Sequence, residues 1–175
     1  MQQKREVKVL LSESFKELVL EKPVEKIYYA AAALDASSYP LAVEGLKRKV
    51  TLVDWLGRDN ASNTAYIALQ GERGAKRAKL EFRTLRIRES KALLEIRLLT
   101  GRHHQIRIQM ANAGMPLLGD RKYGGNREQE ASVQGKEGAD LPLCLCAASL
   151  SFVHPAEGKR MSFHVEPAWL PLVSE

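Results

Sequence analysis

Basic and imidazole side chains gather in one short stretch near the middle of the chain. Arg102, His103, His104 and Arg107 follow Thr100-Gly101, a dipeptide that ends an apolar run. A loop between a strand and a helix brings such side chains to a helix N-terminus, where anions are favoured. The stretch therefore predicts a site for a phosphate or a carboxylate. In the alternative interpretation, Arg107 is an ordinary surface arginine and the histidines make only local hydrogen bonds.

The spacing of the histidines and cysteines argues against a metal site. His103 and His104 are adjacent, so they do not share a helix face as histidines at i and i+4 do, and no carboxylate stands at the spacing of a zinc-protease motif. Cys144 and Cys146 lack the spacing of a zinc ribbon or a redox pair. We therefore expect two buried free thiols, and neither a metal nor a cofactor.

A strand, a loop and a helix must position the basic stretch. Apolar residues at every second position between Ala92 and Leu99 fill one face completely, which predicts a core strand. The pattern over His104–Ala113 predicts a helix, and Gly114 follows it at the position that favours a residue without Cβ.

The rest of the chain predicts an α+β fold, with a mixed, mostly antiparallel sheet and few helices, in a single domain over residues 1–175. An amphipathic pattern predicts a helix over residues 5–20, which Pro23 ends. Polar composition predicts a surface loop at residues 57–64 and a flexible loop at 124–140. Further strands are expected at residues 26–34, 50–53, 65–70, 77–88, 143–152 and 161–165.

The basic stretch belongs to a longer motif. It reads Thr100-Gly101-Arg102-x-His104-Gln105-Ile106-Arg107, then Gly114-x-Pro116-Leu117-Leu118-Gly119-Asp120 and Tyr123-Gly124. In order, spacing and residue type this motif resembles the signature segment of RluA-type RNA pseudouridine synthases. Glu25-Lys26-Ile27-Tyr28 is similar to that family's strand with an active-site tyrosine, and residues 143–163 are similar to its closing strands. His103 and Cys146 depart from the family pattern, which favours a small hydroxyl residue and a histidine there.

The resemblance implies an enzyme that isomerises uridine to pseudouridine in ribosomal or transfer RNA. By that resemblance Tyr28 stacks on a flipped uracil and Arg107 holds the nucleophilic carboxylate, while Leu145 helps to line the pocket. In the alternative interpretation Tyr28 is a core tyrosine, and for Leu145 the sequence alone favours a plain core leucine. RNA-binding roles are expected for Arg102, His104 and Gln105, and for a further set of basic residues that would line a groove: Lys47, Arg48, Lys49, Arg86 and Arg88.

The catalytic aspartate that the resemblance implies does not stand in this sequence. The family carries it in a His-Arg-Leu-Asp loop upstream of the tyrosine strand, whereas every aspartate here, from Asp35 to Asp140, follows Tyr28. The sequence therefore predicts an N-terminally truncated domain that is inactive by itself. A missing strand would leave a gap in the sheet, which favours self-association or a strand-donating partner. The alternative is a non-catalytic RNA-binding module with the same fold.

Charge and composition are compatible with this interpretation. Lys and Arg number 27 against 21 Asp and Glu, and the net charge of +6 favours an acidic partner such as RNA, although a mixed charged surface also serves solubility. No apolar run is long enough to span a bilayer, so no membrane role is expected. Two cysteines and the lack of a signal-peptide pattern predict a cytoplasmic protein.

Overall fold

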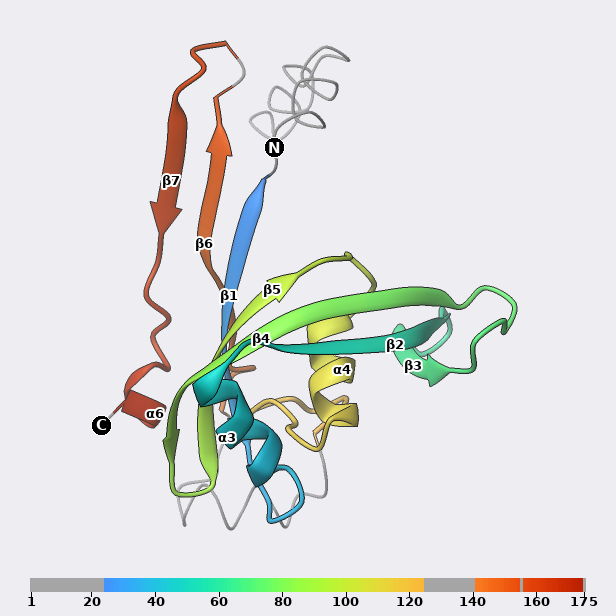
Figure 1. Ribbon diagram of the computed structural model, residues 1–175. Coiled ribbons are helices and arrows are strands. Elements are labelled where there is room, and N and C mark those ends of the chain that lie inside the picture. The colour runs from blue at the N-terminus through green and yellow to red at the C-terminus, as the bar shows by residue number, and fades with distance from the viewer. Residues whose placement is uncertain (1–23, 125–140, 155, 175) are drawn as a thin grey trace.

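Seven antiparallel strands organise the part of the chain that the computed structural model describes, residues 24–124, 141–154 and 156–174 (Figure 1). They lie in one sheet in the order β3-β2-β4-β5-β1-β6-β7, and every pairing is antiparallel. The strands are β1 (Glu25–Ala33), β2 (Val50–Asp59), β3 (Thr64–Ala68), β4 (Lys76–Arg88), β5 (Lys91–Leu98), β6 (Leu145–Val153) and β7 (Arg160–His164).

Three helices accompany the sheet in the described residues: α3 (Tyr39–Lys47), α4 (Gln105–Asn112) and α6 (Pro171–Ser174). The α+β fold is therefore confirmed, as are the strands expected at residues 26–34 and 92–99 and the helix after the basic stretch. Gly114 takes a φ of +75°, which is the left-handed conformation predicted for it. The expected helix at 5–20 and residues 125–140 of the expected flexible loop lie outside the described residues.

Helix α3 is an element that the sequence pattern did not predict. Pro40 stands in its first turn, where a proline costs no hydrogen bond, and Lys47 stands in its last turn. The helix lies very close to β4, because a Cβ on Gly45 would be 2.3 Å from Thr84 Oγ1 and 3.0 Å from the Phe82 ring. Only a glycine allows this approach.

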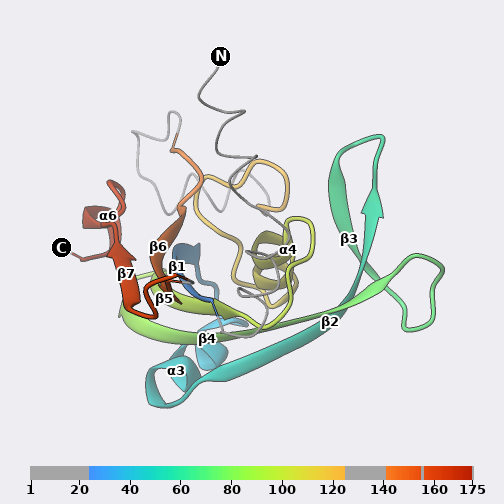
Figure 2. The ribbon, with the colours of Figure 1, turned by 90° about the horizontal axis from the view of Figure 1, so that it is seen from above.

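Two faces of the sheet carry different cores. The face with Tyr28, Ala30 and Ala32 packs against α4 through Ile106 and Met110. Burying each of these two α4 side chains contributes about 1.5–3 kcal/mol, which holds the short helix on the sheet. The other face packs against the C-terminal segment, and its buried residues are Ala31, Leu93, Leu118, Cys144, Trp169 and Val173. Figure 2 shows the β2–β3 hairpin curving away from the rest of the sheet, beside α4.

Three expectations need correction. Residues Gly57–Asp59 are not loop but the end of β2, because their backbone pairs with β3 through Gly57 and Tyr66. Cys144 is fully buried, and burial raises its pKa to about 11, whereas Cys146 is only half-buried; both are free thiols. The described sheet has no gap, since β1 pairs on both sides and the edge strands are β3 and β7.

The part of the chain that the structure describes contains no helix long and apolar enough to cross a membrane.

Candidate active site

A buried ion pair lies at the centre of the motif. On α4, Arg107 donates from Nε to Asp120 Oδ2 at 2.8 Å and from Nη2 to Asp120 Oδ1 at 2.7 Å. The Asp120 side chain is fully buried and that of Arg107 is 16% exposed. A two-point pair of this kind fixes the plane of the guanidinium group. Because Nε and Nη2 are used, the edge formed by Nη1 and the second Nη2 hydrogen has no partner among the described residues.

A sharp turn brings Asp120 to this position. Gly119 adopts a φ of +72°, and a Cβ there would lie 2.2 Å from the backbone oxygen of Pro142. Asp120 Oδ1 also accepts hydrogen bonds from the backbone N–H groups of Lys122 and Tyr123, at 2.9 and 3.0 Å. Burial by itself would raise the pKa of Asp120, but the bonds from Arg107 and from these two N–H groups outweigh it and hold the pKa below its usual value.

Tyr123 joins the ion pair to the β2–β3 hairpin. Its ring lies beneath Arg107, with the guanidinium carbon 5.0 Å from the ring centroid. Its hydroxyl accepts the backbone N–H of Ala65 at 2.6 Å and shares a 2.9 Å hydrogen bond with Nδ1 of His104. The ring of His104 in turn stacks on that of His103, 3.9 Å between centroids. The hairpin and α4 are thereby held together around one aromatic side chain.

The environment of His104 favours its neutral form. The residue precedes α4 in the left-handed conformation, with a φ of +49°. Burial lowers the pKa of His104, and the positive charges of Arg107 and Lys122 nearby lower it further, together with His103. A neutral imidazole can share the Tyr123 hydroxyl bond without adding another charge beside Arg107.

Gln105 holds the loop that carries Arg102. Its Oε1 accepts the Thr100 hydroxyl and the backbone N–H of Arg102, both at 2.9 Å, and its Nε2 donates to the Lys79 oxygen at 3.1 Å and to Gln109 at 2.9 Å. Only 2% of the residue is exposed. The direct RNA contact expected for Gln105 does not fit this burial, because every polar group of its side chain already has a partner inside the protein.

Tyr28 and Leu145 lie on the α4 side of the sheet, as their expected roles require. Tyr28 pairs with Ile96 on β5 and Ala147 on β6, and Leu145 pairs with Ala30 of β1. Both side chains are half-buried against the core that α4 covers. Ala147 is exposed beside Tyr28, so the surface next to the tyrosine is open and lined by a small residue.

The structure does not bring the expected basic residues into one groove. Arg102 donates from Nε to the Arg77 oxygen at 3.0 Å, near the start of β4. Arg86 and Arg88 stand at the far end of that strand, roughly 30 and 36 Å from Arg77 along the strand at a rise of about 3.3 Å per residue. Lys47, Arg48 and Lys49 form a third group between α3 and β2, and Arg48 pairs with Glu44 of the same helix.

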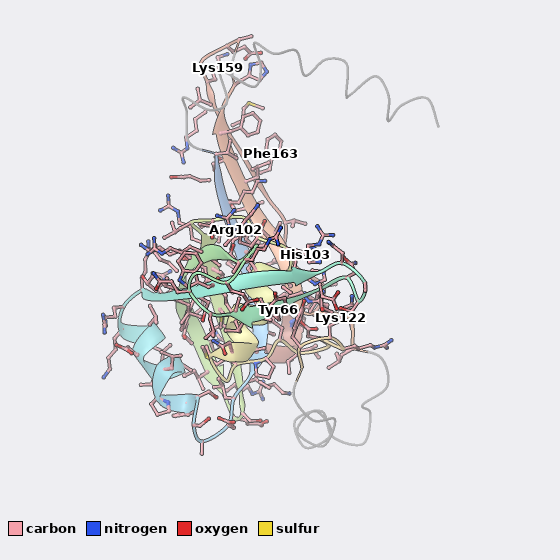
Figure 3. The ribbon with its side chains drawn as sticks, turned by 90° about the vertical axis from the view of Figure 1, so that its right-hand side faces the viewer. Tyr66, Arg102, His103, Lys122, Lys159 and Phe163 are labelled. Carbon is pink, nitrogen blue, oxygen red and sulfur yellow. The ribbon has the colours of Figure 1, made fainter. Side chains whose placement is uncertain are left out.

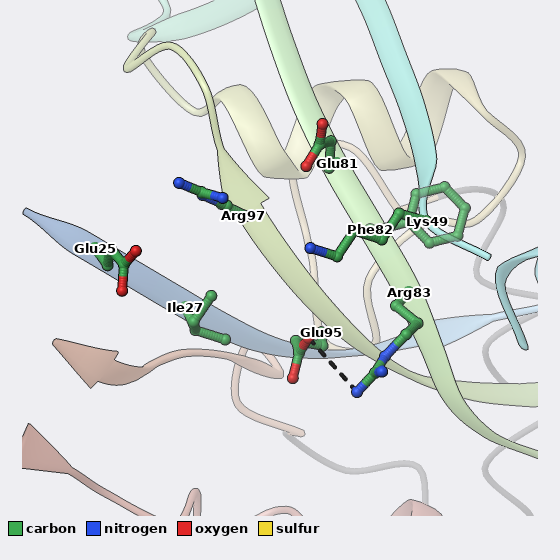
Figure 4. A pocket seen from close by; sticks show the side chains of 8 residues that line it. All are labelled: Glu25, Ile27, Lys49, Glu81, Phe82, Arg83, Glu95 and Arg97. Atoms are coloured by element: carbon green, nitrogen blue, oxygen red, sulfur yellow. Dashed lines mark ion pairs between the residues drawn. The ribbon is translucent and has the colours of Figure 1, made fainter. Parts of the chain in front are cut away.

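A hollow of about 190 Å³ opens on the opposite face of the sheet (Figure 4). Ile27 and Arg97 line it and alternate with Tyr28 and Ile96, which face α4. Its charged lining is balanced, with Lys49, Arg83 and Arg97 against Glu25, Glu81 and Glu95, and Arg83 stands 3.8 Å from Glu95. The hollow is therefore separate from the Tyr28 and Arg107 side of the molecule and has no excess of positive charge for RNA.

Sequence reasoning missed the two residues on which Arg107 depends. Asp120 and Tyr123 stand in the motif, and their fixed spacing after the helix was visible, but no sequence pattern states that the chain turns back at Gly119. The sequence also did not predict that His103 and Lys122 share a hydrogen-bond acceptor: both approach the backbone oxygen of Asn63, at 3.4 and 3.0 Å.

Comparison with known proteins identifies the family of the chain. The family model described as RNA pseudouridylate synthase matches residues 10–112. The chain is 36% identical over 105 residues to ribosomal large subunit pseudouridine synthase D of Zymomonas mobilis, covering 59% of this chain and 32% of that protein. It is 33% identical over 131 residues to the chloroplastic RNA pseudouridine synthase 2 of Arabidopsis thaliana, covering 64% and 30%.

Solved structures share the fold. The human RNA pseudouridylate synthase domain-containing protein 4 superposes with a TM-score of 0.64 at 18% identity, over 95% of this chain and 66% of that one. The human domain-containing protein 1 gives 0.60 at 24% identity, over 90% and 58%. The chain spans about a third of the length of the curated relatives named above. Because the family model covers more than half of the chain, the chain belongs to the RNA pseudouridylate synthase family, of the RluA type.

Proposed function

We propose that this chain supplies the uridine pocket and the carboxylate-orienting arginine of an RNA pseudouridine synthase. The observation that carries the proposal is the buried pair of Arg107 with Asp120, which leaves one edge of the guanidinium group unused among the described residues. Tyr28 lies on the same side of the sheet as the helix that bears Arg107. An arginine held in this way can receive a second carboxylate through two further hydrogen bonds.

The reaction breaks the N-glycosidic bond of a uridine, turns the base and rejoins it through carbon 5, which loses its proton. The base must first leave its stack, at a cost of about a few kcal/mol. Tyr28 suits this step because its ring offers a stacking face and its hydroxyl a polar group beside the open surface at Ala147. Leu145, which lies opposite Ala30 on the same face of the sheet, adds an apolar wall.

The nucleophilic carboxylate is not supplied by the aspartates around the site. Asp120 is fully buried and bound to Arg107, while Asp54 accepts hydrogen bonds from Gln109 at 2.7 Å and from Asn112 at 2.9 Å. Covalent catalysis requires a carboxylate that can reach the sugar. We propose that a His-Arg-Leu-Asp loop outside these 175 residues provides it and that the unused edge of Arg107 receives it.

The proposed substrate is a structured RNA. Two features support it: the net charge of +6 and the names of relatives that modify the large ribosomal subunit. A non-catalytic RNA-binding module is the second candidate, favoured by the lack of a suitable aspartate in this sequence. A strand-donating partner or a second copy would pair at the β3 or β7 edge. The cytoplasm is the proposed compartment, on the sequence grounds given above.

Release of tritium from RNA labelled at carbon 5 of uridine tests the proposal. The chain alone should release none, and the chain mixed with a polypeptide that contains the His-Arg-Leu-Asp loop and its following strand should release it. Arg107→Gln should abolish the regained activity, whereas Arg83→Gln, on the other face of the sheet, should not. Turnover by the chain alone would contradict the assignment of the nucleophile. If the mixture binds RNA but shows no turnover, the RNA-binding module is the correct function.

A further inference from the structure

We propose that Arg77, Arg102, His103 and Lys122, here called the motif rim, bind the RNA backbone where it enters the site. The proposal rests on the function proposed above, because it takes RNA as the ligand, and it adds the surface on which the RNA lies. Figure 3 shows Arg102, His103 and Lys122 on one side of the molecule, at the level of the β2–β3 hairpin and below the β6–β7 arm.

Shared contacts hold the motif rim together. Arg102 binds the backbone oxygen of Arg77 at 3.0 Å. Its neighbour His103 reaches the oxygen of Asn63 at 3.4 Å, and Lys122 donates to the same oxygen at 3.0 Å. These are two groups of hydrogen bonds, one on the Arg77 oxygen and one on the Asn63 oxygen, and the peptide bond between Arg102 and His103 in the loop before α4 connects them.

The cations of the motif rim lack acidic partners. Arg77, Arg102 and Lys122 are exposed, and the described residues place none of them in an ion pair. Several other surface cations are neutralised: Arg83 by Glu95, and Arg160 by Glu25. Asp59, at the end of β2, accepts hydrogen bonds from the Ser62 hydroxyl and the Ala61 N–H, and within the described residues it forms no ion pair with the motif rim. The positive charge of the motif rim is thus available to phosphates.

A series of side-chain contacts connects the motif rim to Arg107. The ring of His103 stacks on that of His104, which shares a hydrogen bond with Tyr123, and Arg107 lies over the Tyr123 ring. Phosphates held on the motif rim would place the neighbouring nucleotide close to the proposed pocket. Within the described residues, Lys47, Arg48 and Lys49 at the α3–β2 junction and Arg88 at the end of β4 take no part in this series of contacts, so we expect RNA to bypass them.

Salt-dependent RNA binding by the full 175-residue chain tests the assignment. The probe is a fluorescein-labelled stem-loop of ribosomal RNA, titrated at about 50 to 200 mM salt. Neutralising two phosphate contacts in R102Q/K122Q should lower the slope of log affinity against log salt by about two and weaken binding more than about tenfold at the lowest salt. The matched control K47Q/R88Q removes the same two residue types elsewhere and should change the slope by less than about half a unit.

Further variants separate charge from folding. R102K/K122R keeps both charges and should retain the slope of the native chain. The single variant Arg102→Gln removes one exposed cation together with its bond to the Arg77 oxygen, and should lower the slope by about one. If the slope falls as much in the control K47Q/R88Q as in R102Q/K122Q, or does not fall in R102Q/K122Q, the motif rim is not the RNA-binding surface, although RNA remains the ligand. No measurable affinity of the unchanged chain for RNA at the lowest salt overturns the proposed function itself and, with it, the motif rim.

Discussion

The substitution Asp120→Asn tests the central contact of the site, because it keeps the shape of the side chain and removes its charge. In the native chain, Asp120 is fully buried and binds Arg107 at 2.7 and 2.8 Å. An asparagine retains one oxygen acceptor and turns the other into a donor, which faces N–H groups that also donate. Arg107 then loses its counter-charge in a setting where it is only 16% exposed.

The size of the effect follows from this burial. Removing one partner of a buried ion pair costs about 3–5 kcal/mol. Because the guanidinium group keeps some contact with water, we expect the lower end, about 3 kcal/mol. In a chain of this size each kcal/mol lowers the melting temperature by about 2–4 °C, so the variant should melt about 6–12 °C below the native chain.

Thermal and urea unfolding followed by circular dichroism measure this difference. Asp54→Asn is the matched control: Asp54 accepts hydrogen bonds from two neutral amides, Gln109 and Asn112, and its replacement should cost about 1 kcal/mol. A cycle with Arg107→Gln and the double variant isolates the pairing energy. An Asp120→Asn cost no larger than that of Asp54→Asn, or a coupling energy near zero, would refute the reasoning that the pair fixes Arg107.

Two further predictions concern the surroundings of the pair. The pKa of His104 is lower in the folded chain than in the unfolded chain, so the unfolded chain binds more protons as the pH falls. The stability that neutral His104 contributes is therefore complete above its ordinary pKa of about 6.5 and is lost as pH falls through the lowered folded-state pKa. Urea midpoints measured between about pH 4.5 and 7.5 should therefore fall on acidification, and His104→Asn, which tolerates the left-handed backbone, should show a smaller fall; an equal fall would contradict the assignment. Gly119→Ala places a Cβ 2.2 Å from the Pro142 oxygen and should lower the free energy of unfolding clearly more than Gly74→Ala does. At Gly74 nothing lies near the added Cβ, so only the left-handed backbone opposes the alanine, at about 1–2 kcal/mol. Equal urea midpoints for the two variants would show that the turn at Gly119 is not constrained by Pro142.

The sheet was predictable from the sequence because its strands follow local rules. Between Ala92 and Leu99, alternation of side chains alone indicates which face is buried, and β5 runs over Lys91–Leu98. The end of β2 was predicted as loop because Gly57 and the polar residues after it resemble a turn. The pairing of Gly57 with Tyr66 overrides that composition, since a strand partner supplies hydrogen bonds that local propensity does not contain.

Helix α3 shows the opposite limit. Its position against β4 depends on Gly45, a residue that weakens an isolated helix but allows close packing on Thr84 and Phe82. The signals for this helix, Pro40 at its start and Lys47 at its end, were present but weak. Tertiary contact decides the conformation of this segment, and such contacts are not visible in a window of sequence.

The sequence motif contains the residues of the candidate site but does not state the contacts between them. The motif indicated Arg107 as the residue that holds a carboxylate, and in the structure the carboxylate bound to it is Asp120, thirteen residues further along the chain. Asp120 binds the edge of the guanidinium group formed by Nε and Nη2, so it does not compete with a second carboxylate for the edge that includes Nη1. The fixed spacing from the helix to Gly119-Asp120 then has a physical reason: the chain must pass beside β1, where Leu118 N–H bonds to Ala31, and turn at Gly119 before Asp120 can reach back to α4.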